Sequence, residues 1–165
     1  MEKTLSGVVH IFGDNIDTDQ IYPGRYLELT DPKEIALHCL EGADAGFISR
    51  SKPGDIVVAG KNFGCGSSRE QAAITLKAAG IGMIVAPSFA RIFYRNAINL
   101  GLPLIICSGI LQKVQNGDHI TIDMAQGAIF NDTGKKISCE PLSGFVMSIL
   151  ENGGIKSMIR SRYSK

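Results

Sequence analysis

The chain has 165 residues, enough for one domain with a hydrophobic core, and we expect a single domain over residues 1–165. Apolar residues make up 44% and charged residues 20%, and the formal net charge is +1. No overall field therefore favours nucleic acid or an anionic membrane as a partner. The N-terminus lacks the apolar segment of a signal peptide, and the most apolar run, Leu102–Cys107, is too short to span a bilayer, so we expect a cytoplasmic protein.

Hydrophobic patterning and turn residues divide the chain into strands and helices. The basic end, 156–165, is expected to be loosely held. The other predicted elements are a strand at 5–12, an acidic loop at 13–20, a helix from Pro32 to about 40, a strand at 55–60, a helix at 68–79, a strand at 82–86, a helix at 89–100 capped by Ser88, a strand at 104–107, hairpin strands at 120–123 and 128–130, and a helix at 141–150.

Strands and helices alternate in the centre of the chain, which predicts a parallel sheet covered by helices. The C-terminal third is different, because Asn116-Gly117 and Gln126-Gly127 are typical of tight turns between antiparallel strands. We therefore expect one α/β domain with parallel central strands and a β-rich C-terminal third.

Cysteine and histidine spacing predicts no metal site in this chain. The four cysteines form no C-x-x-C pair, which argues against a zinc or iron–sulfur site held by this chain alone. We expect reduced, mostly buried thiols. The histidines are also isolated and show no metal-ligand spacing. These residues are Cys39, Cys65, Cys107 and Cys139, and His10, His38 and His119.

The segment Gly64-Cys65-Gly66-Ser67-Ser68-Arg69-Glu70 joins a predicted strand to the start of a helix. Its glycines allow a sharp turn and a close approach of the backbone to a ligand. A helix N-terminus offers free N–H groups and the positive end of the helix dipole. Two hydroxyls and a guanidinium add donors suited to a carboxylate. The segment thus predicts a carboxylate site, in which one of the serines is a candidate proton-abstracting base.

Other interpretations of this segment stay open. Ser67 and Glu70 have the spacing of a capping box, which is a purely structural pattern. Nucleotide binding is disfavoured, because the segment lacks the P-loop lysine and has Arg69 where a dinucleotide fingerprint needs glycine. Cys65 could be a nucleophile at a helix N-terminus, although no Cys–His signature accompanies it.

The acidic loop carries a second candidate site, Asp17-Thr18-Asp19. Two carboxylates one residue apart could bind a hard cation, although the rest of a calcium loop is missing. They could equally orient a neighbouring arginine or take part in proton transfer. A solvated turn without a function is the structural alternative, because Asp and Asn are common turn residues.

Three long segments lie along the first two thirds of the chain: Gly13–Pro23 followed by Tyr26-Leu27, then Gly60–Glu70, then Ser88–Pro103. Together and in this order they resemble the family of 3-isopropylmalate dehydratase small subunits, in the aconitase superfamily. The resemblance implies a swivelling β/β/α domain. It also implies a separate large subunit with a [4Fe-4S] cluster, whose open iron binds the carboxylate and hydroxyl of the substrate while the small subunit closes over it.

The resemblance also implies roles for individual residues. Ser67 corresponds to the family's catalytic base, and Asp19 to a supporting acid. Ser68 and Arg69, with Gly66 beside them, correspond to contacts with the substrate carboxylate and the transition state. These roles imply a hydro-lyase that eliminates water from a 2-hydroxy-dicarboxylate and adds it back, with no metal bound by this chain.

The residues after Tyr26-Leu27 resemble the selectivity loop of the family. A homoaconitase-type subunit is expected to have an arginine there, whereas this chain has Glu28, which would repel an extra carboxylate. Leu29 suits the branched alkyl group of 3-isopropylmalate, an intermediate of leucine biosynthesis. Gln71 departs from the histidine that the family often has. Citramalate and 2,3-dimethylmalate stay open as substrates, and a non-catalytic carboxylate-binding regulatory module is the alternative of another class.

Overall fold

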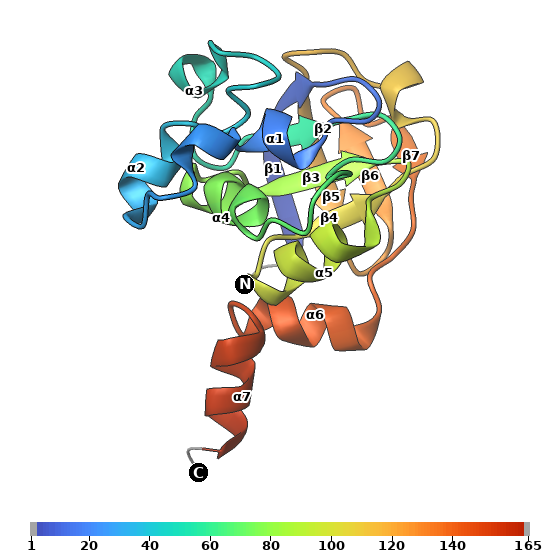
Figure 1. Ribbon diagram of the computed structural model, residues 1–165. Helices are drawn as coiled ribbons and strands as arrows, with labels where there is room; N and C mark the ends of the chain where they lie inside the picture. The colour runs from blue at the N-terminus through green and yellow to red at the C-terminus, as the bar shows by residue number, and fades with distance from the viewer. Residues whose placement is uncertain (1–2, 164–165) are drawn as a thin grey trace.

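A mixed sheet runs through the centre of the molecule (Figure 1). In residues 3–163, which the computed structural model describes, seven strands lie in the order β4-β3-β2-β1-β5-β6-β7. Strands β1 to β4 are parallel, whereas β5 pairs antiparallel with β1, β6 with β5, and β7 with β6. The strands are β1 (Thr4–Ile11), β2 (Ile56–Val58), β3 (Met83–Ala86), β4 (Leu104–Ile106), β5 (His119–Asp123), β6 (Ala128–Asn131) and β7 (Lys136–Ser138).

The first strand joins the two halves of the sheet. On one side Val9 lies opposite Ile56 of β2, and on the other Gly7 lies opposite Ile120 of β5. The predicted parallel centre and the predicted antiparallel hairpins are therefore confirmed. They form one continuous sheet because β1 pairs with both.

The predicted helices are present, although α2 ends earlier than expected. The elements that were not predicted are the strand β7, the helices α1, α3 and α7, and the two 3₁₀ turns η1 and η2. The helices and turns are α1 (Thr18–Ile21), η1 (Gly24–Tyr26), α2 (Pro32–Ala36), α3 (Phe47–Arg50), α4 (Gln71–Ala78), α5 (Arg91–Asn99), η2 (Ile110–Gln112), α6 (Gly144–Glu151) and α7 (Ile155–Tyr163).

The predicted start of α4 was wrong. The helix begins at Gln71, three residues later than expected, and its N-cap is Glu70 with no side-chain cap. Ser67 is therefore not a capping residue, and the capping-box interpretation of this segment fails. The serines belong instead to the loop that precedes the helix.

Ser88 does not cap α5 either. The N-cap is Ala90, again without a side-chain hydrogen bond. The hydroxyl of Ser88 accepts a hydrogen bond from the backbone N–H of Asn62 at 2.8 Å. Ser88 thus holds the loop after β2 instead of starting a helix.

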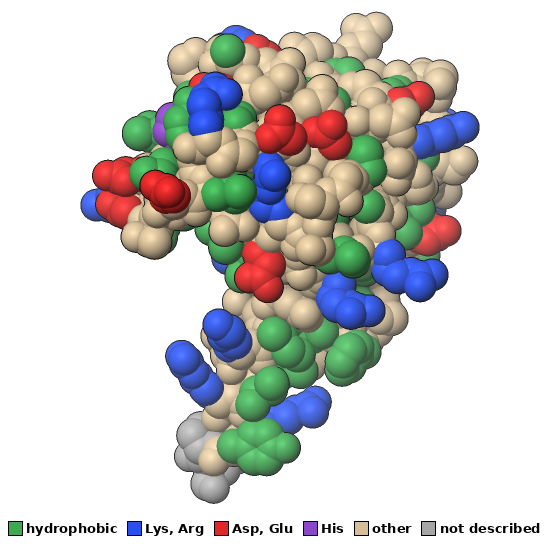
Figure 2. Space-filling view, viewed as in Figure 1, with side chains coloured by type: hydrophobic (Ala, Val, Ile, Leu, Met, Phe, Trp, Pro, Cys, Tyr) green, Lys and Arg blue, Asp and Glu red, His purple; other side chains and the backbone are tan. Residues whose placement is uncertain are grey.

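The C-terminal segment is ordered, contrary to the prediction of a loosely held end. Residues 155–163 form α7, which extends away from the body of the molecule (Figure 1). Met158 anchors it, with only 4% of its surface exposed. Basic and hydrophobic side chains gather on this projecting part (Figure 2). In the described part of the chain, no helix has the length and apolarity needed to cross a membrane.

Two buried clusters lie on the two faces of the parallel strands. Val57 of β2 belongs to the cluster that also contains side chains of α4 and α5. Its neighbours Ile56 and Val58 point to the other face and belong to the second cluster. That cluster also contains Ile122 and Ile129, so the antiparallel strands cover the second face. Burial on both faces explains why β2, β3 and β4 are continuous apolar runs.

Candidate active site

The candidate site lies at the carboxyl ends of β1 and β2. Because these strands are parallel neighbours, the loops that follow them leave the sheet at the same edge. Two backbone hydrogen bonds join the loops, from Gly64 N to the Ile16 carbonyl and from Thr18 N to the Cys65 carbonyl, both at 2.8 Å. The two motifs singled out from the sequence therefore form one site.

Two glycines allow this close approach. Gly64 has a φ of +85°, and a Cβ there would lie 2.2 Å from the ring of Phe93. Gly66 has a φ of +102°, and a Cβ there would lie 3.2 Å from the Thr18 hydroxyl. Residues with side chains rarely adopt such φ values, and at residue 64 no side chain fits without moving Phe93. The sequence predicted a close approach of this backbone to a ligand. In the structure, the backbone at Gly64 and Gly66 closely approaches the side chains of Phe93 and Thr18.

The hydroxyl of Ser67 lies 3.1 Å from that of Thr18. Thr18 is 3% exposed, whereas Ser67 is exposed at the surface. A buried hydroxyl therefore holds an exposed one, which restricts the orientation of Ser67. Thr18 was part of the candidate site Asp17-Thr18-Asp19, but no role was predicted for its hydroxyl, because nothing in the local pattern indicated that its partner would be Ser67.

Arg69 lies beside Asp19. Its Nη1 donates to Asp19 Oδ1 at 3.2 Å and to the carbonyl of Tyr22 at 3.1 Å. The N–H of Gly24 also donates to Asp19 Oδ1, at 2.9 Å. The Gly24 N–H and the Arg69 guanidinium hold the pKa of Asp19 below its usual value. Asp19 is thus ionised at neutral pH and fixes the guanidinium.

Asp17 has a separate structural role. Its carboxylate accepts a hydrogen bond from Gln20 N at 2.8 Å, and the Gln20 side chain accepts one from Asp17 N at 3.0 Å. This reciprocal pair is a capping box that starts α1. Asp17 and Asp19 therefore have different partners, which favours the arginine-orienting interpretation of the acidic loop over cation binding. Within residues 3–163, no three His, Cys, Asp or Glu side chains are grouped as metal ligands.

Glu28 and Leu29 follow the 3₁₀ turn η1, close in sequence to the Asp19–Gly24 contact. Glu28 is exposed and Leu29 is half-buried. The N–H of Leu29 donates to the carbonyl of Tyr26 at 3.1 Å. The structure thus connects this loop to Arg69 through Gly24 and Asp19. It shows no hydrogen bond from Glu28 or Leu29 to the serines, as far as the described residues go.

The thiol of Cys65 has no histidine base. Among the described residues, each histidine is bonded to a carboxylate elsewhere, and the carbonyl of Cys65 is what joins the two loops. The alternative of a Cys–His nucleophile is therefore not supported. All four cysteines are free, with Cys39 and Cys107 buried and Cys65 and Cys139 half-buried, as expected for reduced thiols.

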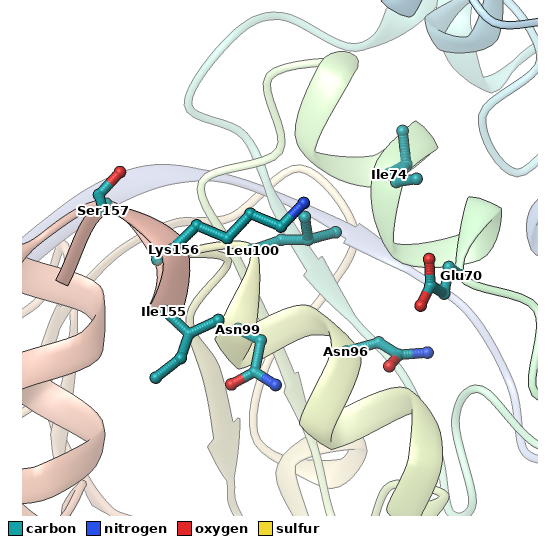
Figure 3. Close-up of a pocket in the computed structure, with 10 residues that line it drawn as sticks. Glu70, Ile74, Asn96, Asn99, Leu100, Ile155, Lys156 and Ser157 are labelled. Carbon is teal, nitrogen blue, oxygen red and sulfur yellow. The ribbon is translucent and has the colours of Figure 1, made fainter. Parts of the chain in front are cut away.

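A cavity of about 370 Å³ lies next to the candidate site, between α4, α5 and the start of α7 (Figure 3). Glu70 contributes to its wall, but Ser67, Ser68 and Arg69 are absent from the described lining. Ser67 and Ser68 instead lie on an open surface. The lining residues are Glu70, Ile74, Asn96, Asn99, Leu100, Gly153, Gly154, Ile155, Lys156 and Ser157.

Known proteins share this fold and sequence. The aconitase C-terminal domain model matches residues 14–108. The 3-isopropylmalate dehydratase small subunit 1 of Methanopyrus kandleri is 53% identical over 97% of this chain and 95% of its own length. The isopropylmalate/citramalate isomerase small subunit of Methanocaldococcus jannaschii is 50% identical over 100% of this chain and 99% of its own length. A crystal structure of 3-isopropylmalate dehydratase from M. jannaschii matches with a TM-score of 0.91 and 48% identity, over 96% of this chain and 95% of that one.

The chain therefore belongs to the aconitase C-terminal domain family. Within that family it groups with the small subunits of the 3-isopropylmalate dehydratases. The resemblance identified from three sequence segments is thus confirmed, and so is the fold that it implied. The roles of the individual residues stay predictions.

Proposed function

We propose that the chain, acting as one swivel domain over residues 1–165, is the small subunit of a two-subunit hydro-lyase with Ser67 as its proton-abstracting base. The observation that carries this proposal is the hydroxyl pair of Thr18 and Ser67 at 3.1 Å, beside the pair of Arg69 and Asp19 at 3.2 Å. Thr18 orients Ser67, the exposed base, and Asp19 fixes the guanidinium of Arg69, which would bind a substrate carboxylate. Relatives at 53% and 50% identity are small subunits of isopropylmalate enzymes.

The residues fit the requirements of the reaction. Loss of a proton next to a carboxylate needs a base, and donors to stabilise the developing charge. Arg69, Ser68 and the backbone at Gly66 would bind the carboxylate, with Asp19 supporting the guanidinium. Ser67 in its deprotonated form would take the proton from one carbon and become a neutral hydroxyl, the C–H electrons would form the double bond, and hydroxide would leave the neighbouring carbon with the C–O electron pair. The reverse steps return water to the alkene.

We further propose that a cluster-bearing large subunit completes the site. Ser67 and Ser68 are exposed on an open surface, which suits a half-site covered by a partner. The described residues offer no grouped metal ligands, so we assign the [4Fe-4S] cluster to the large subunit. When bound, the cluster would supply a Lewis acid for the departing hydroxyl. The expected location of this complex is the cytoplasm.

3-Isopropylmalate is the substrate that we propose, which places the enzyme in leucine biosynthesis. Leu29 is half-buried and can pack on an isopropyl group, whereas the exposed Glu28 would repel the third carboxylate of homoaconitate. Citramalate is the next candidate, because the M. jannaschii relative is named for both acids. 2,3-Dimethylmalate would fit the same residues.

The test is a reconstitution with the large subunit under anaerobic conditions. Alkene formation would be followed on 3-isopropylmalate, citramalate, 2,3-dimethylmalate and homocitrate. Ser67→Ala should lower kcat by roughly 10³-fold, in the range of lost general-base catalysis. Ser6→Ala is the matched control, since Ser6 also bonds a threonine hydroxyl, that of Thr121 at 2.7 Å. Lack of turnover of every acid with an intact cluster would refute the proposal and favour a carboxylate-binding module.

A further inference from the structure

One carboxylate, that of Glu41, gathers three side chains around the proposed selectivity loop. Its Oε1 accepts from the hydroxyl of Tyr26 at 2.9 Å and from Arg25 Nη2 at 3.0 Å. Its Oε2 lies 2.5 Å from Nδ1 of His38. The rings of Tyr26 and His38 are stacked with centroids 3.5 Å apart, and the guanidinium of Arg25 lies 4.7 Å from the Tyr26 ring centroid. We call Glu41, Tyr26, Arg25 and His38 the loop clamp.

Glu41 is held close to the active-site helix α1. The flanking N–H groups of Leu40 and Gly42 donate to the carbonyls of Ile21 at 2.8 Å and Gln20 at 3.0 Å. A Cβ on Gly42 would lie only 2.7 Å from the Gln20 Cα, so the two segments are in direct backbone contact. The segment that carries Glu41 is therefore fixed to the same short helix that carries Asp19.

The clamp secures the end of η1, and Asp19 secures its start. The N–H of Gly24 donates to Asp19 Oδ1 at 2.9 Å, and the hydroxyl of the buried Tyr22 donates to the Tyr26 carbonyl at 2.6 Å. Glu28 and Leu29 come next in the chain after Leu27, the C-cap of this turn. The backbone that leads into Glu28 and Leu29 is consequently held in a fixed position relative to Arg69.

The charge of Glu41 matters for these contacts. Its burial raises its pKa, but the hydrogen bonds from His38, Tyr26 and Arg25 outweigh burial and keep the pKa below its usual value. An ionised carboxylate accepts on both oxygens, which suits three donors. A glutamine has only one oxygen acceptor, so it cannot accept hydrogen bonds at both ends of its side-chain group as the carboxylate does.

We propose that Glu41 is a positioning residue for substrate selection: through the loop clamp it places Glu28 and Leu29 against the alkyl side of the substrate. The inference rests on the proposed function, since it assigns selection to the loop beside the proposed active site. Glu41 does not itself touch the substrate. Loss of the Glu41 carboxylate should therefore change the ratio of kcat/KM for 3-isopropylmalate and citramalate, and it should change the rate of the chemical step much less.

The test compares wild type and Glu41→Gln with the large subunit on 3-isopropylmalate and citramalate. The ratio of their kcat/KM values should shift about 10-fold toward citramalate, the size of a lost alkyl contact, because citramalate lacks the branched group. kcat/KM for citramalate itself should stay within about 2-fold, since the base and the carboxylate contacts remain. Asp132→Asn, which removes the carboxylate bonded to His119 at 3.1 Å, is the matched control.

Tyr26→Phe is a second variant that removes one hydroxyl and keeps the ring stack. It should shift the ratio in the same direction by a smaller factor, and it tests the proposal even if Glu41→Gln fails to fold. An unchanged ratio in both variants, or an equal loss on both acids, would overturn the inference. Absence of turnover by the wild type would instead count against the proposed function.

Discussion

Within residues 3–163, two serine–threonine hydroxyl pairs are present, one between antiparallel strands and one in the loops that follow the parallel strands. Ser6 and Thr121 lie opposite each other on β1 and β5, with hydroxyls 2.7 Å apart. Thr18 and Ser67 lie 3.1 Å apart in loops beyond the ends of the parallel strands. The first is an ordinary cross-strand contact. The pair of Thr18 and Ser67 has the ion pair of Arg69 and Asp19 beside it. This position gives a serine and a threonine hydroxyl a proposed catalytic role.

This difference follows from the two kinds of sheet. Antiparallel neighbours connect through tight turns, whereas parallel neighbours need long crossovers that begin and end at opposite edges. The loops after β1 and β2 therefore meet at one edge, where they can carry side chains that act on a ligand. The antiparallel half covers the second face of the parallel strands and supports them.

The largest expected effect on stability comes from Gly64→Ala in the parallel half. Its φ of +85°, and the ring of Phe93 at 2.2 Å from where the alanine Cβ would lie, predict a loss of about 3 kcal/mol in the free energy of unfolding. Gly117→Ala is the matched control in the other half, with a φ of +90° and open space, and should cost about 1 kcal/mol. Urea denaturation measures both, and equal costs would contradict the packing argument.

Thr18→Val should lower kcat by about 10-fold with KM unchanged, because it removes the hydroxyl that orients Ser67 but leaves Arg69 in place. Thr121→Val, which removes the corresponding hydroxyl in the antiparallel half, should leave kcat unchanged. Steady-state kinetics of the reconstituted complex separate the two. A loss of activity shared by both variants would mean that the hydroxyl pairs are only structural.

Ile129→Val should have the smallest effect. Ile129 is fully buried in the second cluster, and loss of one methylene there should cost about 1 kcal/mol. kcat/KM should not change, because the antiparallel half supports the site without contributing to it. Thermal denaturation and kinetics on the same sample provide the measurement. A fall in kcat/KM without a matching loss of stability would contradict the view that the antiparallel half only supports the site.

Six of the seven described strands, all except β7, were predicted from sequence patterns alone, and so were the order of the motifs and the family. Buried apolar runs and turn residues are local signals, and Asp31-Pro32 starts α2 as predicted. The exposed pair Ser67-Ser68 and Arg69 were also identified as candidates, because hydroxyls and a guanidinium at a glycine-rich turn suit a carboxylate.

The positions of those groups and their contacts depend on the tertiary structure. The local spacing of Ser67 and Glu70 fitted a capping box. The hydrogen bonds from Gly64 N to the Ile16 carbonyl and from Thr18 N to the Cys65 carbonyl instead hold this segment against the loop after β1, outside α4. The contacts of Ser67 with Thr18 and of Tyr26 with Glu41 join residues far apart in the chain. Such contacts depend on which strands become neighbours, and that is settled only when the whole core is buried.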